Sequence, residues 1–523
     1  MASAGRASSP TARETELKLA VTPRTFERLR RDPVLGAPAG PAAPLESLYF
    51  DTADHALWRS GMALRLRREG GHWIQTIKGQ GAVVAGVHQR AEFNRRARRG
   101  WPDPRLLGDS EIERRVAAVT EPLVPVFRVV VEREQRLLVP APGVLIEVSF
   151  DRGRIEAGRA RAAVCEIELE LKEGPVASLY ELALAVLARA PARIEPRSKA
   201  GRGYQLAGVG QPAPVRIRRD VVRSGMTTSE AFRASAVACL DHLYANQPGV
   251  LAGGQAEYLH QVRVALRRLR SLLDVFRPPA AKSAVRPHRQ ALRRITRALG
   301  PARDLDVFVA HTLAPMLEQF PGHRGLAAFE RAAGRLCADA NRRARRILGN
   351  RRSQADLLRL ADWLAGQAWL EDGSPADTLA WAAPAREHAA AVLERCHRRV
   401  LKRGRGIGSA EPARLHRLRI ALKQLRYAAG FFAPLFPRAR VAPMRETLDG
   451  LQELLGSIND HAAATELIAA VGRRARGPLQ PQARLILEHW NEALLAEQRR
   501  ALKPAWKTLR ACAPFWCRAR TIQ

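Results

Sequence analysis

The chain has 523 residues, of which 46% are hydrophobic and 26% charged, and a formal net charge of +35. This length exceeds one ordinary domain and supplies more than one core. Residues 1–210 carry +8 and residues 211–523 carry +27, so the second part suits nucleic acid, polyphosphate or an anionic membrane surface. No uncharged apolar run approaches the roughly 20 residues that span a bilayer.

Cysteine spacing indicates the compartment. The six cysteines show neither CxxC spacing nor a dense disulfide pattern, so we expect reduced thiols in a cytosolic protein. The N-terminus reaches Glu14 and Glu16 without a hydrophobic signal segment. The expected location is therefore the cytoplasm.

From about Arg13 to Tyr204 the chain alternates with period 2 between Gly and Pro breaks, which predicts strands with two or three helices between them. The predicted strands are Glu14–Ala20, Ser47–Asp51, Met62–Arg68, Trp73–Lys78, Val87–Asn94, Val129–Val139, Val144–Asp151 and Val164–Lys172. Eight is a natural number for a closed barrel. Residues 32–44 read as a loop and residues 207–215 as an interdomain linker.

Beyond about Thr227 the period becomes helical, and the sequence repeats itself. HQVRVALRRLR from His260 returns as HRLRIALKQLR from His416, and LGPARDLDV from Leu299 returns as LGSINDHAA from Leu455, both 156 positions later. Two matches at one offset indicate an internal duplication. An apolar seam recurs by threes and fours in both copies, as in a helix bundle: Leu259, Val262, Leu266, Leu269, Leu273 and Phe276, then Leu415, Leu418, Leu422 and Leu425. Pro- and Gly-containing breaks fall at 371–386, 402–412 and 471–482, the first being the candidate joint between copies.

One face of the predicted strands is charged rather than apolar. This face carries Glu14, Glu16 and Lys18, then Arg65 and Arg67, Thr76 and Lys78, Glu147, Ser149 and Asp151, and Glu166, Glu168, Glu170 and Lys172. The simplest interpretation is a solvated face of an open antiparallel sheet. However, stacked glutamates repel unless a cation or arginine compensates them. Carboxylates for a divalent cation and Arg or Lys for phosphate would instead form a phosphoryl-transfer pocket inside a closed barrel.

Eight segments in order resemble the CYTH, or triphosphate tunnel metalloenzyme, family. They are ETELK from Glu14, YFDT from Tyr49, MALRLRR from Met62, QTIKG from Gln75, GVHQRAEFN from Gly86, IEVSFDRG from Ile146, CEIELELKEG from Cys165 and SKAGRGYQL from Ser198. The resemblance implies an eight-stranded antiparallel tunnel that binds a triphosphate with Mg²⁺ or Mn²⁺. Family members hydrolyse inorganic or thiamine triphosphate, and some cyclise ATP; the overall similarity is to the bacterial inorganic triphosphatase branch.

The same resemblance implies roles for individual residues. The implied metal ligands are Glu14 and Glu16 with Glu168 and either Glu166 or Glu170, completed by Glu147 or Asp151. The implied phosphate ligands are Lys18, Arg65, Arg67, Lys78, Arg133 and Lys199, with Arg128 as an alternative to Arg133. The implied reaction is attack of a metal-oriented water on the terminal phosphorus, with an acidic side chain accepting the proton.

Each copy of the repeat places a ladder of cations beside its apolar seam. The ladders are His260, Arg263, Arg267 and Arg270, and His416, Arg419, Lys423 and Arg426. Such runs are usually solvated faces, but this one occurs twice, and no acidic partner lies at i±4 within either motif, which favours an anion site. Asp304 and Asp460 match across copies and read as helix caps or as partners of the ladders.

The segments VRVALRRLR, LGPARDLDV, LRIALKQLRY and LQELLGSIND resemble the CHAD domain. This resemblance implies two pseudo-symmetric four-helix bundles whose facing surfaces form a basic channel for inorganic polyphosphate. Charge clustering adds Arg293, Arg294, Arg297, Arg342, Arg343, Lys402, Arg438 and Arg445 as further contributors.

The expected organisation is a two-domain α+β protein. It has a CYTH tunnel domain at 1–206, a linker at 207–226 and a CHAD domain at 227–515, with halves near 227–371 and 386–515. The expected activity is metal-dependent hydrolysis of inorganic triphosphate or a related triphosphate, in the cytoplasm or at polyphosphate granules. The alternative is a non-catalytic protein that binds and targets polyphosphate. Nucleic-acid binding is compatible with the charge, but few aromatic side chains accompany the basic segments.

Overall fold

The structure is a computed structural model that describes residues 12–517 except 70, 80, 109, 211, 219, 277–281, 372–373, 408–410 and 476–479. The chain divides into two compact units. The barrel unit comprises the chain up to Pro214 together with Gly349–Gly366. The helical unit comprises Val215–Leu348 and the chain from Gln367 onward.

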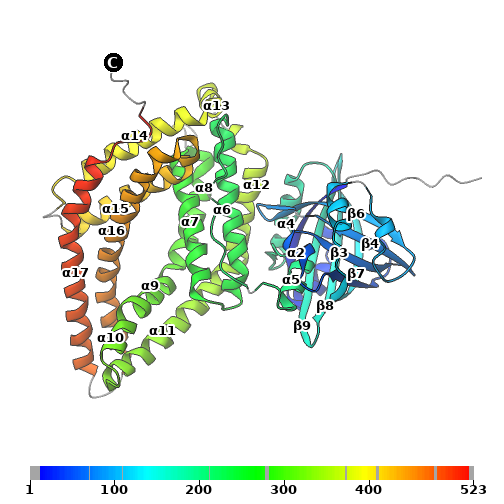
Figure 1. Cartoon of the computed structure of the whole chain (residues 1–523), viewed down its shortest axis with the longest axis horizontal. Coiled ribbons are helices and arrows are strands. Elements are labelled where there is room, and N and C mark those ends of the chain that lie inside the picture. Colours follow the sequence, from blue (N-terminus) through cyan, green and yellow to red (C-terminus); the bar gives the residue numbers. More distant parts are fainter. Residues whose placement is uncertain are drawn as a thin grey trace, which may run out of the picture. The chain divides into compact units, whose positions relative to one another are not determined.

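The barrel unit is built on one antiparallel sheet (Figure 1). Its strands are β1 (Ala12–Ala20), β2 (Ala43–Asp51), β3 (Ala63–Glu69), β4 (His72–Lys78), β5 (Ala82–Val84), β6 (Val87–Ala97), β7 (Val124–Ala141), β8 (Val144–Ala157), β9 (Ala160–Glu173) and β10 (Arg193–Ile194). Eight of them follow the order β1-β9-β8-β7-β2-β3-β4-β6, and β6 pairs with β1 to close the ring. The predicted eight-stranded antiparallel barrel is therefore confirmed. The short strands β5 and β10 pair beside it and were not predicted.

Helices cover the apolar outer face of the strands. The barrel unit contains α1 (Pro23–Arg30), η1 (Pro33–Leu35), α2 (Ala56–Arg59), η2 (Pro104–Leu106), α3 (Glu111–Ala117), α4 (Ala177–Arg189), α5 (Lys199–Leu206) and α12 (Arg351–Ala365). Phe26 of α1 meets Phe150 of β8 edge to face at 5.5 Å, and α4 packs on β1 and β9 and is itself packed by α12. Because Leu17 and Leu19 are completely buried on this outer face, the alternate charged residues point into the barrel. The charged face is therefore the interior of a closed barrel and not one side of an open sheet.

The helical unit contains no strand among its described residues. Its elements are α6 (Thr228–Leu251), α7 (Ala256–Val275), α8 (Lys282–Ala298), α9 (Gly300–Phe308), the π-helix η3 (Val309–Leu313), α10 (Ala314–Gln319), α11 (Arg324–Leu348), η4 (Ala368–Leu370), α13 (Pro375–Ala382), α14 (Ala385–Arg403), α15 (Pro412–Phe432), η6 (Ala433–Leu435), α16 (Arg438–Gly472) and α17 (Gln480–Ala511). At the offset of the repeat, α7 corresponds to α15, and α8 with α9 corresponds to the single long helix α16. The segment proposed as the joint contains α13. The predicted all-helical fold of this part is confirmed.

The two copies share their cores. Phe308, Leu313 and Phe329 of the first copy belong to the same buried cluster as Ile468 and Leu487 of the second. Elsewhere α7 contacts α15, and α6 contacts α14. Both predicted apolar seams are buried, as their spacing predicts. Packing thus joins helices across the copies, and this brings the two cation ladders near each other.

Two further observations concern the whole described chain. Its helices include none with a stretch apolar and long enough to span a membrane. All six cysteines lie in the described part of the chain, and none forms a disulfide there.

Candidate functional site

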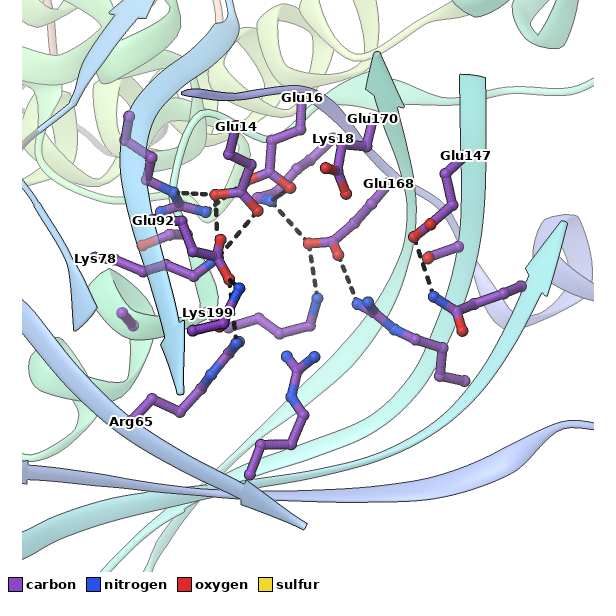
Figure 2. A pocket seen from close by; sticks show the side chains of 18 of the residues that line it. Glu14, Glu16, Lys18, Arg65, Lys78, Glu92, Glu147, Glu168, Glu170 and Lys199 are labelled. Atoms are coloured by element: carbon purple, nitrogen blue, oxygen red, sulfur yellow. Dashed lines mark hydrogen bonds and ion pairs between the residues drawn. The ribbon is translucent and has the colours of Figure 1, made fainter. Parts of the chain in front are cut away.

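The barrel encloses a cavity of about 580 Å³ lined almost entirely by charged and polar side chains. The lining consists of Glu14, Glu16, Lys18, Tyr49, Arg65, Arg67, Lys78, Arg90, Glu92, Asn94, Arg133, Gln135, Glu147, Ser149, Glu168, Glu170, Leu171, Lys172, Ser198, Lys199 and Ala200. These residues come from eight strands and from α5, segments far apart in the sequence. Figure 2 shows the carboxylates of Glu14, Glu168, Glu170 and Glu147 arranged around the same space that Arg65 enters from below.

The carboxylates of β1 are held by cations from β4 and β6. Glu14 accepts hydrogen bonds from Lys78 Nζ at 3.0 Å and from Arg90 Nε at 2.7 Å, and Arg90 also bonds to Glu16. Burial opposes the ionisation of Glu14, but Lys78 and Arg90 outweigh it and lower its pKa. Glu14 is therefore a carboxylate at neutral pH.

A second cluster lies where α5 meets β8 and β9. Lys199 Nζ lies 2.5 Å from Asp151 and from Glu166 and 2.9 Å from Glu168. Arg133 Nε donates to Asp151 at 2.6 Å, and its guanidinium also reaches Glu168 at 2.6 Å. Asp151 and Glu166 are buried outside the cavity lining, whereas Glu168 belongs to it.

The cavity has one region that favours a cation and another that favours an anion. Burial raises the pKa of Glu170, and the neighbouring Glu14 and Glu147 add to this effect against Lys172. Burial together with Arg65 and Arg133 lowers the pKa of Arg67 to about 10. Carboxylates therefore lie close together in the first region, and arginines lie close together in the second. A bound cation would stabilise the first region and a bound anion the second.

The donor set fits a hard divalent cation. Oxygen atoms of Asp151, Glu166 and Glu168 lie within 4.8 Å of one another, and carboxylate oxygens suit Mg²⁺. These three carboxylates are already paired with four cations, Lys18, Arg133, Lys199 and Arg202. Glu170 and Glu147, by contrast, share the single Lys172. The structure thus brings all seven predicted metal ligands into two adjoining groups and leaves Glu14, Glu16, Glu147, Glu168 and Glu170 facing the cavity.

All six predicted phosphate ligands line the cavity. Lys18 bonds to Glu168 at 2.8 Å, Arg65 to Thr76 at 3.0 Å and Arg67 to Ser47 at 3.2 Å. Lys78, Arg133 and Lys199 bond to carboxylates as described above. The alternative Arg128 points elsewhere, because it pairs with Glu156 and Glu46 and is half exposed.

Two charged lining residues are not among the site residues predicted from the sequence. Arg90 bridges Glu14 and Glu16, and Glu92 lies 2.6 Å from Lys78 and 3.5 Å from Arg65. Both lie within the segment GVHQRAEFN, and both alternate with its apolar positions. The alternation of polar and apolar residues in this segment was therefore the sequence feature that indicated an interior position for both side chains.

In the helical unit the two ladders approach each other through α7 and α15. Burial lowers the pKa of Lys423 to about 7, and Arg419 on its own helix and Arg267 on the other ladder contribute further. Burial and Arg267 likewise lower the pKa of Arg263 to about 10. These are crowded, half-buried cations rather than a solvated face.

The other ladder positions differ between copies. His260 is half-buried, and its pKa is lowered to about 4 by burial and Arg303, whereas His416 is exposed. Arg270 lies near Asp274 and Arg293, and Arg426 bonds to Asp449 at 2.9 Å. Arg294, on α8, is half-buried. Asp460 lies 3.9 Å from Arg419, and Asp304 interacts with Arg263, so the matched aspartates are partners of the ladders.

Comparison with known proteins agrees with these two folds. The CYTH domain family matches residues 12–204, and the CHAD domain family matches residues 234–469. An inorganic triphosphatase of Haemophilus influenzae is 34% identical over 164 residues, which are 31% of this chain and 46% of that protein. The match thus spans less than half the length of this curated relative.

Solved structures resemble each part. The CHAD domain of the plant Ricinus communis is 28% identical and covers 58% of this chain and 98% of its own, with a TM-score of 0.48. HpAC1 from Hippeastrum, for which a dominant triphosphatase activity is described, is 21% identical and covers 37% of this chain and 95% of its own, with a TM-score of 0.28. The two family matches, which fall on the closed barrel and on the all-helical unit, show that the chain contains a CYTH domain followed by a CHAD domain.

Proposed function

We propose that the barrel hydrolyses the terminal phosphoanhydride bond of inorganic triphosphate with Mg²⁺ or Mn²⁺. One observation carries the proposal: the cavity inside the barrel places a carboxylate region, where the pKa of Glu170 is raised, beside a cationic region, where the pKa of Arg67 is lowered. A triphosphate with a bound divalent cation satisfies both regions at once.

The proposed metal ligands are Glu14 and Glu16 on β1 with Glu168 and Glu170 on β9 and Glu147 on β8, because these carboxylates face the cavity. A divalent cation held there would neutralise phosphate oxygens and lower the pKa of a bound water. The remaining functions belong to the protein's own side chains.

The cations provide the phosphate site. Arg65, Arg67 and Arg133 supply planar donors suited to phosphate oxygens, and Lys18, Lys78 and Lys199 supply point charges. Water attacks the terminal phosphorus, the bond to the bridging oxygen breaks, and pyrophosphate leaves. A carboxylate of the acidic group accepts the proton of the water, while the fixed cations stabilise charge on the departing oxygen.

The lining also favours an inorganic substrate over a nucleotide. Its only apolar or aromatic members among the described residues are Tyr49, Leu171 and Ala200, and the ring of Tyr49 is already stacked on Phe127 at 4.4 Å. A nucleobase or thiamine ring would find little surface to stack on. The relative from Haemophilus influenzae, named an inorganic triphosphatase, supports the same choice.

We further propose that the helical unit binds inorganic polyphosphate between the ladders of α7 and α15. The proximity of Arg267 to Lys423 and Arg419 supports this, because buried cations crowd together only at a cost that a polyanion would offset. Binding of this kind would also associate the protein with polyphosphate granules. The proposed domains are those expected from the sequence, with boundaries at 1–206 and 227–515 and a linker between them.

The experiment compares phosphate release from tripolyphosphate, thiamine triphosphate, ATP and long-chain polyphosphate with Mg²⁺ or Mn²⁺. Glu14→Gln with Glu16→Gln should abolish release from tripolyphosphate and leave polyphosphate binding intact. Glu132→Gln is the matched control, because Glu132 is exposed on the outer face of β7. Persistent release from the double variant would reject the assigned site, and absence of release from the unmodified protein would favour the alternative of a non-catalytic polyphosphate-binding protein.

Polyphosphate binding has its own test. Arg263→Ala with Arg419→Ala should weaken binding of labelled polyphosphate, whereas Arg417→Ala should not, because Arg417 is exposed on the same helix as Arg419. Equal losses for each charge removed would show that only net charge matters. Duplex DNA at equal phosphate concentration and physiological salt should not displace the polyphosphate; if it does, the site is not specific.

A further inference from the structure

Two sequence motifs, YFDT at 49–52 and SKAGRGYQL at 198–206, meet at a buried carboxylate that the proposed chemistry does not use. Asp51, at the end of β2, is completely buried. Its carboxylate accepts hydrogen bonds from the backbone N–H groups of Thr52 at 2.8 Å, Leu57 at 2.9 Å and Trp58 at 3.0 Å. The Tyr204 hydroxyl on α5 also donates to this carboxylate, at 2.8 Å. One carboxylate thus ties the turn after β2 to a helix 153 residues away in the sequence.

Aromatic packing strengthens this connection. The Tyr204 ring stacks on Trp58 at 4.4 Å and meets Phe127 edge to face at 5.1 Å. Phe127 in turn stacks on Tyr49, whose ring lines the cavity. A Cβ atom at Gly203 would lie 2.1 Å from the Phe127 ring, so glycine allows α5 to approach this closely. The position of α5 on the barrel is therefore set at its Tyr204 end.

The other end of α5 carries Lys199. Ser198 caps the helix by accepting a hydrogen bond from Gly201 N–H at 3.0 Å, and Lys199 follows as its first residue. Tyr204 lies five positions after Lys199, which is less than one and a half turns of the helix. So short a helix moves as one piece, and any shift at Tyr204 moves Lys199 within the cavity.

We propose that Asp51 and Tyr204 are positioning residues for Lys199, and that their buried hydrogen bond holds α5 so that the Lys199 ammonium reaches the triphosphate. This rests on the proposed function of the barrel. Burial and the adjacent Asp51 carboxylate raise the pKa of Tyr204, which keeps its hydroxyl protonated as a donor. Removing this bond frees α5 to shift, and misplacing a binding group by about 1 Å can cost roughly 100-fold in rate.

The test is a double-mutant cycle between Tyr204→Phe and Lys199→Gln, measured as kcat/KM for tripolyphosphate and as tripolyphosphate affinity by calorimetry. Tyr204→Phe keeps the stacked ring and should lower kcat/KM by about 10- to 100-fold, mostly through KM. In the Lys199→Gln background the same change should have no further effect, because it acts through Lys199. An equal loss in both backgrounds, or no loss in the unmodified protein, overturns the proposal.

A second variant and a control distinguish the proposed positioning role from a general loss of stability. Gly203→Ala should displace α5 from Phe127 and reproduce the effect of Tyr204→Phe, again only when Lys199 is present. Tyr180→Phe removes a different buried tyrosine hydroxyl, which donates to Ala85 O at 3.1 Å. It should lower the melting temperature without changing kcat/KM, and an equal loss of kcat/KM would mean that any buried hydroxyl has this effect. If the unmodified protein binds tripolyphosphate without hydrolysing it, the proposed reaction fails, but the affinity cycle still tests the positioning role.

Discussion

Lys18 on β1 donates a hydrogen bond at 2.8 Å to Glu168, its register partner on the neighbouring strand β9, and lies 2.5 Å from Glu16. A proposed phosphate ligand thus compensates two proposed metal ligands. Burial opposes the charge of Lys18, but Glu16 and Glu168 outweigh it and raise its pKa. The interior is consequently a set of ion pairs, and those that line the cavity lie beside the space where a charged ligand would bind.

Lys18→Met should destabilise the barrel in a way that Mg²⁺ partly reverses. Loss of one partner from a buried pair costs about 3–5 kcal/mol, because the remaining charges stay buried. A divalent cation bound by Glu16 and Glu168 would replace the missing ammonium. Melting temperatures with and without Mg²⁺ measure this, and the Mg²⁺-induced rise should be larger in the variant than in the unmodified protein.

Arg152→Gln is the control for this comparison, because it breaks an exposed pair with Glu27 on the outer surface. Exposed pairs contribute about 0–1 kcal/mol, so its response to Mg²⁺ should match that of the unmodified protein. Equal rises in all three proteins would show that Glu16 and Glu168 do not bind the metal.

Acid should weaken the barrel through the same carboxylates. The pKa values of Glu14 and Asp151 are lowered in the folded state because Lys78, Arg90, Arg133 and Lys199 outweigh their burial. A depressed folded pKa stabilises the fold above the unfolded values of 4.5 for Glu and 3.8 for Asp, and this stabilisation is lost as the pH falls below them. Hydrogen exchange of β1 and β8 amides should therefore accelerate in this acidic range relative to its intrinsic rate. In Glu14→Gln the acceleration of hydrogen exchange at β1 on acidification should be smaller. An unchanged pH dependence of exchange would contradict a stabilising role for the ion pairs of Glu14.

Polyphosphate binding should strengthen as the pH falls through neutrality. The pKa of Lys423 is lowered to about 7 by burial, Arg419 and Arg267, while Asp460 opposes this and Arg426 adds to it. A bound polyanion favours the ammonium form, so binding takes up a proton, and affinity should rise between about pH 8 and about pH 6. His260, with a pKa of about 4, charges mainly below this window.

The measurement is polyphosphate affinity across this pH range in the unmodified protein and in Lys423→Arg. Arginine stays charged throughout, so this variant should bind with much weaker pH dependence and match the unmodified protein at the acidic end. A pH dependence that survives Lys423→Arg would assign the proton to another group.

The sequence predicts the barrel well because alternation reports directly which face of a strand is buried. β1, predicted from Glu14, begins at Ala12 and ends at Ala20 as expected. β7, from Val124 to Ala141, extends beyond the predicted Val129–Val139 at both ends. β5 and β10, with three and two residues, are too short to show a period.

The limits of prediction lie in contacts between distant segments. The Asp51–Tyr204 hydrogen bond joins two recognised motifs, but neither periodicity nor spacing relates positions 153 residues apart. Likewise, His260 and His416 are equivalent in the repeat, yet one is half-buried and the other exposed, because the helices around the two copies differ. Local pattern predicts the elements, whereas packing between them decides each environment.

Arg90 should be as important to the site as the glutamates it holds. Arg90 donates hydrogen bonds to both Glu14 and Glu16. Burial alone would lower the pKa of Arg90, but these two carboxylates outweigh burial and raise it. Arg90→Gln would leave the two glutamates less compensated and free to turn away from the cavity. We expect kcat/KM for tripolyphosphate to fall by about 10- to 100-fold, because the two carboxylates are no longer held in position. Arg96→Gln is the control, since Arg96 is exposed on the same strand and bonds to His72. Equal activities of the two variants would remove Arg90 from the site.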